Sequence, residues 1–257
     1  MMKEKVKVEN FIEETGKITS FSMKFFTEFS FREFEFKEFV RQCYFIGYRS
    51  LPLTGITAFI MGLVITIQAR PTLVEFGAEA WLPKLSSLSM IREICPVITA
   101  LICAGKVGSG IGAELGSMKV TEQIDAMEVS GTNPFRYLVV TRILATTLML
   151  PLLVIFGDGI SLLGSWLGDN LRGHITWPLF RNQVFETLVF GDIIPSVAKS
   201  YFFGFVIGAI GCYKGFTTPS GTEGVGQAAN SAVVISSLII FVIDFIAVQI
   251  SDLLNLT

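Results

Sequence analysis

Six ionisable residues lie within long apolar runs of the sequence, where a charged group can do chemistry that it cannot do at a water-exposed surface. They are Arg92, Glu93, Lys106, Asp158, Lys199 and Asp244. A charge among apolar residues is costly, so such groups usually contact each other, a water-filled cavity or a bound ligand. Long side chains near the end of a run can instead place their charge at an interface, whereas the short carboxylates of Asp158 and Asp244 cannot reach far. The set indicates ion pairing, contact with a polar ligand or a proton relay.

Arg92 and Glu93 are adjacent in this set. Neighbouring side chains of an α-helix point about 100° apart, because the helix has about 3.6 residues per turn. We therefore expect that the two side chains do not face one direction, and that one of them faces a cavity or a partner chain. Three ionisable residues in the run 86–111 indicate that this run faces protein or water rather than lipid.

A second concentration of charge is the stretch MKVTEQIDAMEVSGTNP, residues 118–134, which lies between two apolar runs. It carries Lys119, Glu122, Asp125 and Glu128. Good helix formers and early acidic residues predict a short helix after Thr121, since acids stabilise a helix N-terminus. A helix of about two to three turns is too short to be stable alone in water. We therefore expect this helix to dock on a partner.

The residues after this short helix provide its end and the start of the next one. Gly131 is placed to act as a C-cap, and Asn133 to cap the following helix, with Pro134 at its first position. Ile124 and Met127 share one face ringed by carboxylates, which favours a plug for a cytoplasmic partner with a basic-rimmed groove. The alternative is a connector lying on the membrane, where acidic residues are unfavourable because the cytoplasmic leaflet is itself negative.

The elements that hold these residues are predicted from composition. Of 257 residues, 51% are apolar and 16% are charged, whereas soluble domains have about 25% charged residues. A helix needs roughly 20 mostly apolar residues to cross a membrane, and five runs qualify: 50–69, 86–111, 138–167, 194–213 and 224–243. We predict an all-α polytopic membrane protein with five spans. An N-terminal interfacial segment (1–49) precedes the five-span domain (50–257), and a short cytoplasmic helix at about 118–131 joins spans two and three.

The residues before the first span combine phenylalanine with charge. Residues 20–50, SFSMKFFTEFSFREFEFKEFVRQCYFIGYRS, contain nine phenylalanines, whose spacing fits neither a helix nor a strand period. The mixture suits a segment in the membrane interface. It is either a plain anchor or a clamp that holds the first span against a partner.

Glycines spaced four apart in spans two and four permit close helix packing. They are Gly108, Gly112, Gly116, Gly204, Gly208, Gly211 and Gly215. Packing within the chain is the simpler reading, and a homodimer seam is the alternative. The four cysteines and the single histidine, His174, are scattered, so we expect neither a metal site nor a disulfide framework.

Positive charges predict the orientation in the membrane. Thirteen Lys and Arg residues lie in the N-terminal segment, the loop after span two and the loop after span four, against four on the other side. Because Lys and Arg stay on the cytoplasmic side, we expect the N-terminus and the acidic stretch there, and the C-terminus outside.

The run REICPVITALICAGKVGSGIGAELGSMKVTEQIDAMEVSGTNPFRYLVVTRILATTLMLPLL, residues 92–153, resembles the signature of the MlaE/YrbE permease family. The matching pieces are RE…PV, AG-x-VGS-x-I-x-AELG, TEQIDA-x-E and NP-x-RYLV, and the later GVGQAANSAVV resembles the family's fourth-loop and fifth-span motif. The resemblance extends from about residue 46 to the C-terminus. It departs from the usual family pattern at Cys95, Lys106 and Thr141.

The resemblance implies a permease subunit of an ABC transporter that moves phospholipid or a similar lipid between the inner and outer membranes of a bacterium. It implies a homodimer working with a cytoplasmic ATPase that binds ATP, an MCE-domain lipid-binding protein and sometimes a STAS-domain regulator. The residues to which it gives an ATPase-coupling role are Thr121, Glu122, Gln123, Asp125, Met127 and Glu128. The residues to which it gives a lipid-binding role are Arg92, Glu93, Leu73 and Phe76.

Other functions are weighed against this one. No Walker A sequence occurs, so nucleotide chemistry is expected in another chain and this chain is expected to be non-catalytic. A secondary transporter of a hydrophobic substrate would use Asp158, Lys199 and Asp244 as a relay, but such folds usually show internal repeats, which this sequence lacks. An intramembrane enzyme is weakly supported, because the spans carry no serine–histidine or paired-acid motif. Nothing in the sequence indicates nucleic-acid binding.

Overall fold

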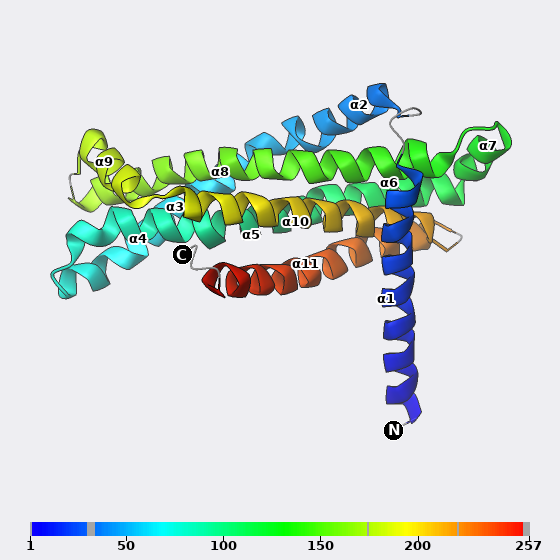
Figure 1. Ribbon diagram of the computed structural model, residues 1–257, viewed down its shortest axis with the longest axis horizontal. Helices are drawn as coiled ribbons and strands as arrows, with labels where there is room; N and C mark the ends of the chain where they lie inside the picture. The colour runs from blue at the N-terminus through cyan, green and yellow to red at the C-terminus, as the bar shows by residue number, and fades with distance from the viewer. Residues whose placement is uncertain (1, 30–33, 174, 220, 254–257) are drawn as a thin grey trace. The chain divides into compact units, whose positions relative to one another are not determined.

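The computed structural model describes residues 2–29, 34–173, 175–219 and 221–253, and within these residues all regular structure is helical. The prediction that His174 stands apart from other ligands falls on a residue outside this range. The α-helices are α1 (Met2–Glu28), α2 (Phe36–Ile46), α3 (Leu51–Glu75), α4 (Leu82–Ser89), α5 (Cys95–Cys103), α6 (Ser109–Val120), α7 (Gln123–Val129), α8 (Thr141–Gly173), α9 (Trp177–Thr187), α10 (Phe190–Phe216) and α11 (Thr222–Leu253) (Figure 1). Short 3-10 turns are η2 (Tyr48–Ser50) and η3 (Glu79–Trp81), and π-helical segments are η4 (Met90–Ile94), η5 (Ala104–Gly108) and η6 (Phe135–Val140).

Five helical segments in the described part of the chain are long and apolar enough to cross a membrane. They are Phe36–Glu75, Glu79–Val120, Phe135–Leu171, Phe190–Phe216 and Thr222–Leu253. Each contains one of the five predicted spans, so the predicted all-α polytopic class is confirmed. Only helices satisfy all their own backbone hydrogen bonds in lipid, which is why apolar runs of this length fold as they do.

The first span continues through a proline. Helix α3 runs through Arg70 and Pro71 to Glu75. A proline removes one backbone hydrogen bond, and spans tolerate this where neighbouring groups satisfy the freed carbonyl. Beyond the C-cap residue Phe76, Gly77 adopts φ 64°, which glycine takes without strain, and the N–H of Ala78 donates to the Leu73 carbonyl.

The Phe-rich N-terminal segment is mostly helical in its described residues, and α1 packs on its own chain. Phe21 contacts the rings of Phe135, Tyr213 and Phe216, with ring centroids 5.1–6.1 Å from its own. Phe26 remains 67% exposed. The segment therefore has one aromatic face against the protein and another left for the surroundings.

Contacts divide the chain into two units. Unit 1 comprises residues 1–43, 104–146 and 205–236, and unit 2 comprises residues 44–103, 147–204 and 237–257. The division follows contacts rather than chain order, and the predicted boundary between residues 49 and 50 stays a prediction.

Glycines bring the helices of unit 1 into close contact. A Cβ atom on Gly215 would lie 2.5 Å from Cβ of Leu115 in α6, and one on Gly211 would lie 3.0 Å from the carbonyl oxygen of Gly108. One on Gly112 would lie 3.3 Å from the carbonyl oxygen of Ala228 in α11. These faces are filled by the chain's own helices, which confirms the packing reading for these glycines.

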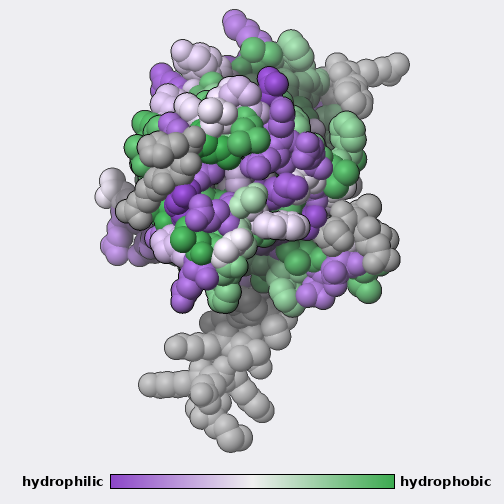
Figure 2. Space-filling view, turned by 90° about the vertical axis from the view of Figure 1, so that its left-hand side faces the viewer, coloured by the Kyte–Doolittle hydropathy of each residue, from purple (hydrophilic) through white to green (hydrophobic). Residues whose placement is uncertain are grey.

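Unit 2 uses glycines that the sequence analysis did not single out. A Cβ atom on Gly62 of α3 would collide with the carbonyl of Ser161, and one on Gly164 of α8 would collide with the carbonyl of Phe59. The backbones of α3 and α8 are therefore in contact over more than one turn, as small residues permit in lipid. Figure 2 views the end of unit 2 that carries α4 and α9, where hydrophilic side chains gather among apolar ones.

Candidate functional site

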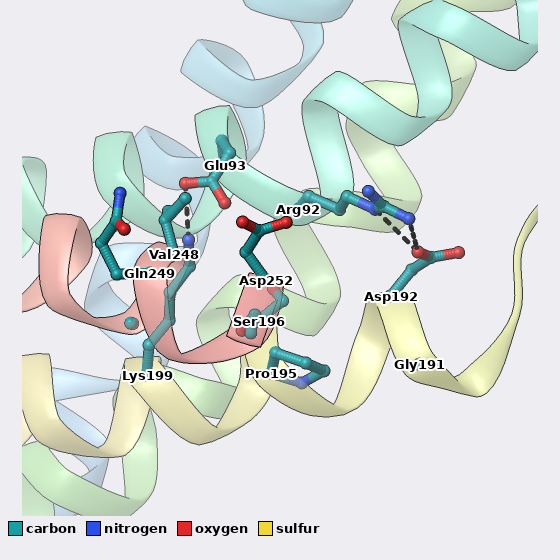
Figure 3. Close-up of a pocket in the computed structure, with 12 residues that line it drawn as sticks. Arg92, Glu93, Gly191, Asp192, Pro195, Ser196, Lys199, Val248, Gln249 and Asp252 are labelled. Carbon is teal, nitrogen blue, oxygen red and sulfur yellow. Dashed lines mark hydrogen bonds and ion pairs between the residues drawn. The ribbon is translucent and has the colours of Figure 1, made fainter. Parts of the chain in front are cut away.

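Unit 2 contains a polar cavity of about 320 Å³ built by η4, α10 and α11, which we name the charged pocket (Figure 3). Its lining residues are Arg92, Glu93, Gly191, Asp192, Pro195, Ser196, Lys199, Ala247, Val248, Gln249, Ser251 and Asp252. Charge is concentrated here inside segments that are otherwise apolar enough to cross a membrane. Ionisable groups within membrane-spanning segments often mark pathways or ligand sites.

One side of the charged pocket is an ion pair between η4 and α10. The Nε of Arg92 donates to Oδ1 of Asp192 over 2.7 Å, and Nη2 donates to the same oxygen. The other oxygen of Asp192 accepts the backbone N–H of Val189 at 2.9 Å. Asp192 is buried, while 31% of the Arg92 side chain is exposed. The arginine therefore presents part of its guanidinium to the pocket.

The other side is a three-residue ion cluster. The Nζ of Lys199 donates to Oε2 of Glu93 over 2.7 Å and to Oδ1 of Asp244 over 2.8 Å, which joins α10 to η4 and α11. Only 4% of the Lys199 side chain is exposed, against 45% for Glu93. The ammonium is thus enclosed, and a face of the Glu93 carboxylate remains open to the pocket.

Both Arg92 and Glu93 line the charged pocket, whereas the sequence led us to expect that one of them faces a cavity or a partner chain. They lie in the π-helical segment η4, and their side chains diverge as expected, Arg92 toward Asp192 and Glu93 toward Lys199 (Figure 3). Their partners Asp192 and Lys199 are seven residues apart, about two helical turns, and so share one face of α10.

Leu73 and Phe76 are not among the residues that line this pocket. Leu73 is half-buried in the last turn of α3, and Phe76, which caps that helix, is 76% exposed. Nearby, Nη1 of Arg70 donates to Asp169 over 2.6 Å and fixes this end of α3 to α8. The lipid-binding role of Leu73 and Phe76 stays a prediction.

Two further ionisable residues from the sequence analysis lie elsewhere. Asp158, in α8, has one buried carboxylate oxygen that makes no hydrogen bond within the described residues. Lys106 is exposed in η5 of unit 1. Neither lines the charged pocket.

Sequence reasoning missed Asp192, Ser196 and Asp252 as pocket residues. Asp192 precedes the predicted start of span four, and its spacing of seven residues from Lys199 was the available signal. Asp252 follows the predicted end of span five.

Unit 1 contains α7, the short helix of the acidic stretch. The predicted caps are confirmed: Gly131 has φ 83°, its N–H donates to Glu128, and the N–H of Thr132 donates to Met127 over 3.1 Å. The side-chain oxygen of Asn133 accepts the N–H of Phe135 at 3.0 Å. These local bonds define both ends of the loop that carries α7 to the third span.

Most of the predicted ATPase-coupling residues lie on the surface. Those exposed are Thr121, Glu122, Gln123, Asp125 and Glu128, while Met127 is half-buried. Ile124 is 4% exposed, so the expectation that it forms an apolar spot for a partner is wrong. An isolated short helix gains stability by burying an apolar side chain on its own protein, and Ile124 does so here. The outer face of α7 is therefore mostly polar and acidic, with Val129 exposed at its last residue.

The surroundings of α7 hold it in place. Nζ of Lys119 pairs with Asp125 over 2.7 Å. Glu28, at the end of α1, accepts from Nδ2 of Asn133 over 3.2 Å and from Nε of Arg136 over 3.0 Å. The N-terminal helix is thus tied to the loop that follows α7.

A buried arginine joins the two spans that flank α7. Arg142 of α8 is 2% exposed, and its Nη2 donates to Glu114 of α6 over 2.9 Å. Its Nη1 donates to the Leu138 carbonyl over 3.0 Å. The orientation argument counted Arg142 as a loop charge, whereas the structure places it inside α8. We name the Arg142–Glu114 pair the α6–α8 clamp.

Comparisons with known proteins agree with this architecture. A family model described as Permease MlaE matches residues 39–250. A probable ABC transporter permease protein of Rickettsia typhi is 38% identical over 210 residues, covering 82% of this chain and 81% of that protein. A probable ABC transporter permease protein of Synechocystis is 38% identical over 206 residues, covering 80% and 78% respectively. Protein TRIGALACTOSYLDIACYLGLYCEROL 1, chloroplastic, of Arabidopsis thaliana is 34% identical over 200 residues, covering 78% of this chain and 57% of that protein. Because the matched region includes all five candidate spans, α7 and most of the charged pocket, this chain belongs to the MlaE family of ABC transporter permeases.

Proposed function

We propose that this permease moves phospholipid or a similar lipid between the inner and outer membranes, driven by a separate cytoplasmic ATPase that binds and hydrolyses the ATP. The observation that carries the proposal is the charged pocket within apolar spans of an ABC permease. Only an amphiphile combines a polar group for such a pocket with an apolar part for the surrounding spans. The name of the Arabidopsis relative, which contains that of a galactolipid, agrees with a lipid cargo.

The proposed lipid contacts are Arg92 and Glu93 in the charged pocket, with Leu73 and Phe76 contributing apolar contacts at the end of α3. Arg92 has exposed guanidinium surface and Glu93 an exposed carboxylate face. Both groups are held by partners on α10, so a headgroup would meet side chains already fixed in place.

The proposed ATPase-coupling element is α7, through Thr121, Glu122, Gln123, Asp125, Met127 and Glu128. Its exposed acidic face suits a groove with a basic rim. The bonds from Glu28 to the loop after α7, and the α6–α8 clamp beside it, support a rigid attachment to the spans. ATP hydrolysis in the partner would move α7, and the spans would open or close the lipid site.

The remaining parts of the proposal rest on the family. They are a homodimer of this chain, an MCE-domain lipid-binding partner, a STAS-domain regulator in some systems, and a location in a bacterial inner membrane with the N-terminus in the cytoplasm. The excess of Lys and Arg in the N-terminal segment and in the loops after spans two and four supports that orientation.

The alternative function is a secondary transporter that uses intramembrane carboxylates and Lys199 as a relay. The bond between Lys199 and Asp244 favours it, because a proton or ion could exchange with such a pair. Membership of an ABC permease family argues against it.

The test is co-purification from the native membrane. The tagged chain should bring an ABC ATPase with it, and the Glu122→Lys, Glu128→Lys double variant should lose that ATPase because two carboxylates of the docking face become cations. The matched control is Glu75→Lys with Glu186→Lys, which makes the same charge change at exposed residues of unit 2. Purification of every form without an ATPase would contradict the proposal and favour the secondary transporter.

A further inference from the structure

The charged pocket has more negative than positive groups. Two cations, Arg92 and Lys199, face four carboxylates. The carboxylates are Glu93, Asp192, Asp244 and Asp252. At neutral pH the formal charge of this set is therefore −2.

Both cations are already engaged by carboxylates. Arg92 directs Nε and Nη2 at Asp192, and Lys199 is enclosed between Glu93 and Asp244. An anionic headgroup would have to displace a carboxylate from its partner or bind close to the surplus negative charge. Like charges brought together with little water between them are disfavoured.

Asp252 is the carboxylate of the pocket that no cation of the described residues engages. It lines the pocket, and its side chain extends from α11 toward the side that carries Arg92 and Glu93 (Figure 3). It makes no hydrogen bond or ion pair with any residue in the described part of the chain. Asp252 also follows residue 250, where the match to the family model ends, and the resemblance gives it no role.

The pocket also contains a hydroxyl that makes no hydrogen bond with the described residues. Ser196 is 1% exposed, lines the pocket, and its Oγ makes no hydrogen bond within the described residues. A buried polar group without a partner costs stability unless a ligand or water satisfies it. Gln249 adds an amide on the same pocket wall. The hydroxyl of Ser196 and the amide of Gln249 can therefore donate hydrogen bonds to the oxygens of a ligand.

From these observations, and resting on the lipid function proposed above, we propose that the charged pocket selects headgroups without net negative charge. The favoured groups are those that offer positively polarised hydrogens to Asp252 and Glu93, namely the ammonium of a zwitterionic phospholipid or the hydroxyls of a sugar headgroup. Ser196 and Gln249 hydrogen-bond the oxygens of the same headgroup. Phosphatidylglycerol and other anionic lipids bind less well.

The test uses the assembly purified with its partners. Labelled phosphatidylethanolamine, phosphatidylglycerol and digalactosyldiacylglycerol compete for it in detergent, and cross-linking to the chain gives the bound ratio. The expected result is a preference of about fivefold for each of the first and third lipids over phosphatidylglycerol, since an exposed charge pair contributes up to about 1 kcal/mol. Preference for phosphatidylethanolamine alone identifies the ammonium as the favoured group, and preference for digalactosyldiacylglycerol alone identifies the sugar hydroxyls. Equal binding of all three, or preference for phosphatidylglycerol, overturns the inference.

Variants locate the selectivity. Asp252→Asn should remove most of the preference, and Asp252→Lys should reverse it toward phosphatidylglycerol. Ser196→Ala should weaken binding of all three lipids without changing their ratio. The matched control is Glu186→Gln, which removes an exposed carboxylate of α9 outside the pocket. Unchanged selectivity in both Asp252 variants would overturn the assignment of Asp252.

The binding ratio separates this inference from the function on which it rests. If ATP drives lipid movement in vesicles and yet binding is unselective, the function stands and the inference fails. If the ratio is as expected and ATP moves none of the three lipids, the pocket is selective and the transport proposal fails.

Discussion

Lys199 is central to the ion cluster of the charged pocket, because its enclosed ammonium donates to both Glu93 and Asp244. Lys199→Met should lower the free energy of unfolding by about 3 kcal/mol, since removing one member of a buried ion cluster leaves the other charges uncompensated. Thermal unfolding in detergent measures this. Lipid binding should fall as well, because Glu93 loses the partner that positions it.

The control for this variant removes all three charges. Lys199→Met combined with Glu93→Gln and Asp244→Asn should recover most of the lost stability, because no isolated buried charge remains. A triple variant as unstable as Lys199→Met alone would show that packing, rather than charge, holds these helices together.

Glu122 has an unusual backbone for its residue type, with φ 59° at the junction of α6 and α7. Glu122→Gly should raise stability by about 1 kcal/mol, because glycine adopts this conformation without strain. The same variant should bind less ATPase, since it loses a carboxylate of the docking face. Unfolding and co-purification measured on one preparation separate the two effects. Loss of both stability and ATPase binding would contradict the account of the strain.

The α6–α8 clamp joins two helices that lie on either side of α7 in the chain. Glu114→Gln should leave the ATPase bound, since α7 is unchanged, and should reduce ATP-driven lipid movement more than ATP hydrolysis. The measurement is the ratio of lipid moved to ATP hydrolysed. The control is Glu13→Gln, which breaks an exposed pair with Lys17 on α1. A Glu114→Gln protein with normal coupling would show that the clamp is structural only.

Helix contacts in unit 1 predict which glycines tolerate a methyl group. Gly215→Ala should destabilise the protein by about 1–3 kcal/mol, because its Cβ would press on Leu115 of α6. Gly226→Ala, on α11, should be neutral or stabilising, because its added Cβ would meet no heavy atom of the described residues within 4 Å apart from its chain neighbours and its own helix backbone. If Gly226→Ala proves as harmful as Gly215→Ala, a second copy or a partner covers that face of α11.

Prediction from sequence succeeded where the structure is set by neighbouring residues. The C-cap of α7 at Gly131, the N-cap of the next helix at Asn133 and the five spans follow from local composition and turn chemistry. It failed to show that Arg92 and Glu93 both line one pocket, because that depends on how α10 and α11 pack against η4. It also failed for Ile124 and Arg142. Their burial depends on which helices meet, and spacing along one helix does not determine that.

At the scale of the whole molecule, α7 belongs to unit 1 and the charged pocket to unit 2. Helices α8, α10 and α11 each contain residues of both units. A membrane helix satisfies most of its backbone hydrogen bonds internally, even where Pro151 in α8 and Pro195 in α10 each remove one, so it transmits displacement along its length better than a loop does. We infer that these three helices carry the motion from the ATPase side to the lipid site.

The most direct test of the central claim is lipid transfer by the reconstituted assembly. Vesicles containing the permease with its co-purified ATPase should move labelled lipid when ATP is added, and the Glu122→Lys, Glu128→Lys variant should not. An imposed proton or sodium gradient without ATP should move none. Lipid movement that follows the ion gradient and ignores ATP, in the wild type and in the variant alike, would contradict the account.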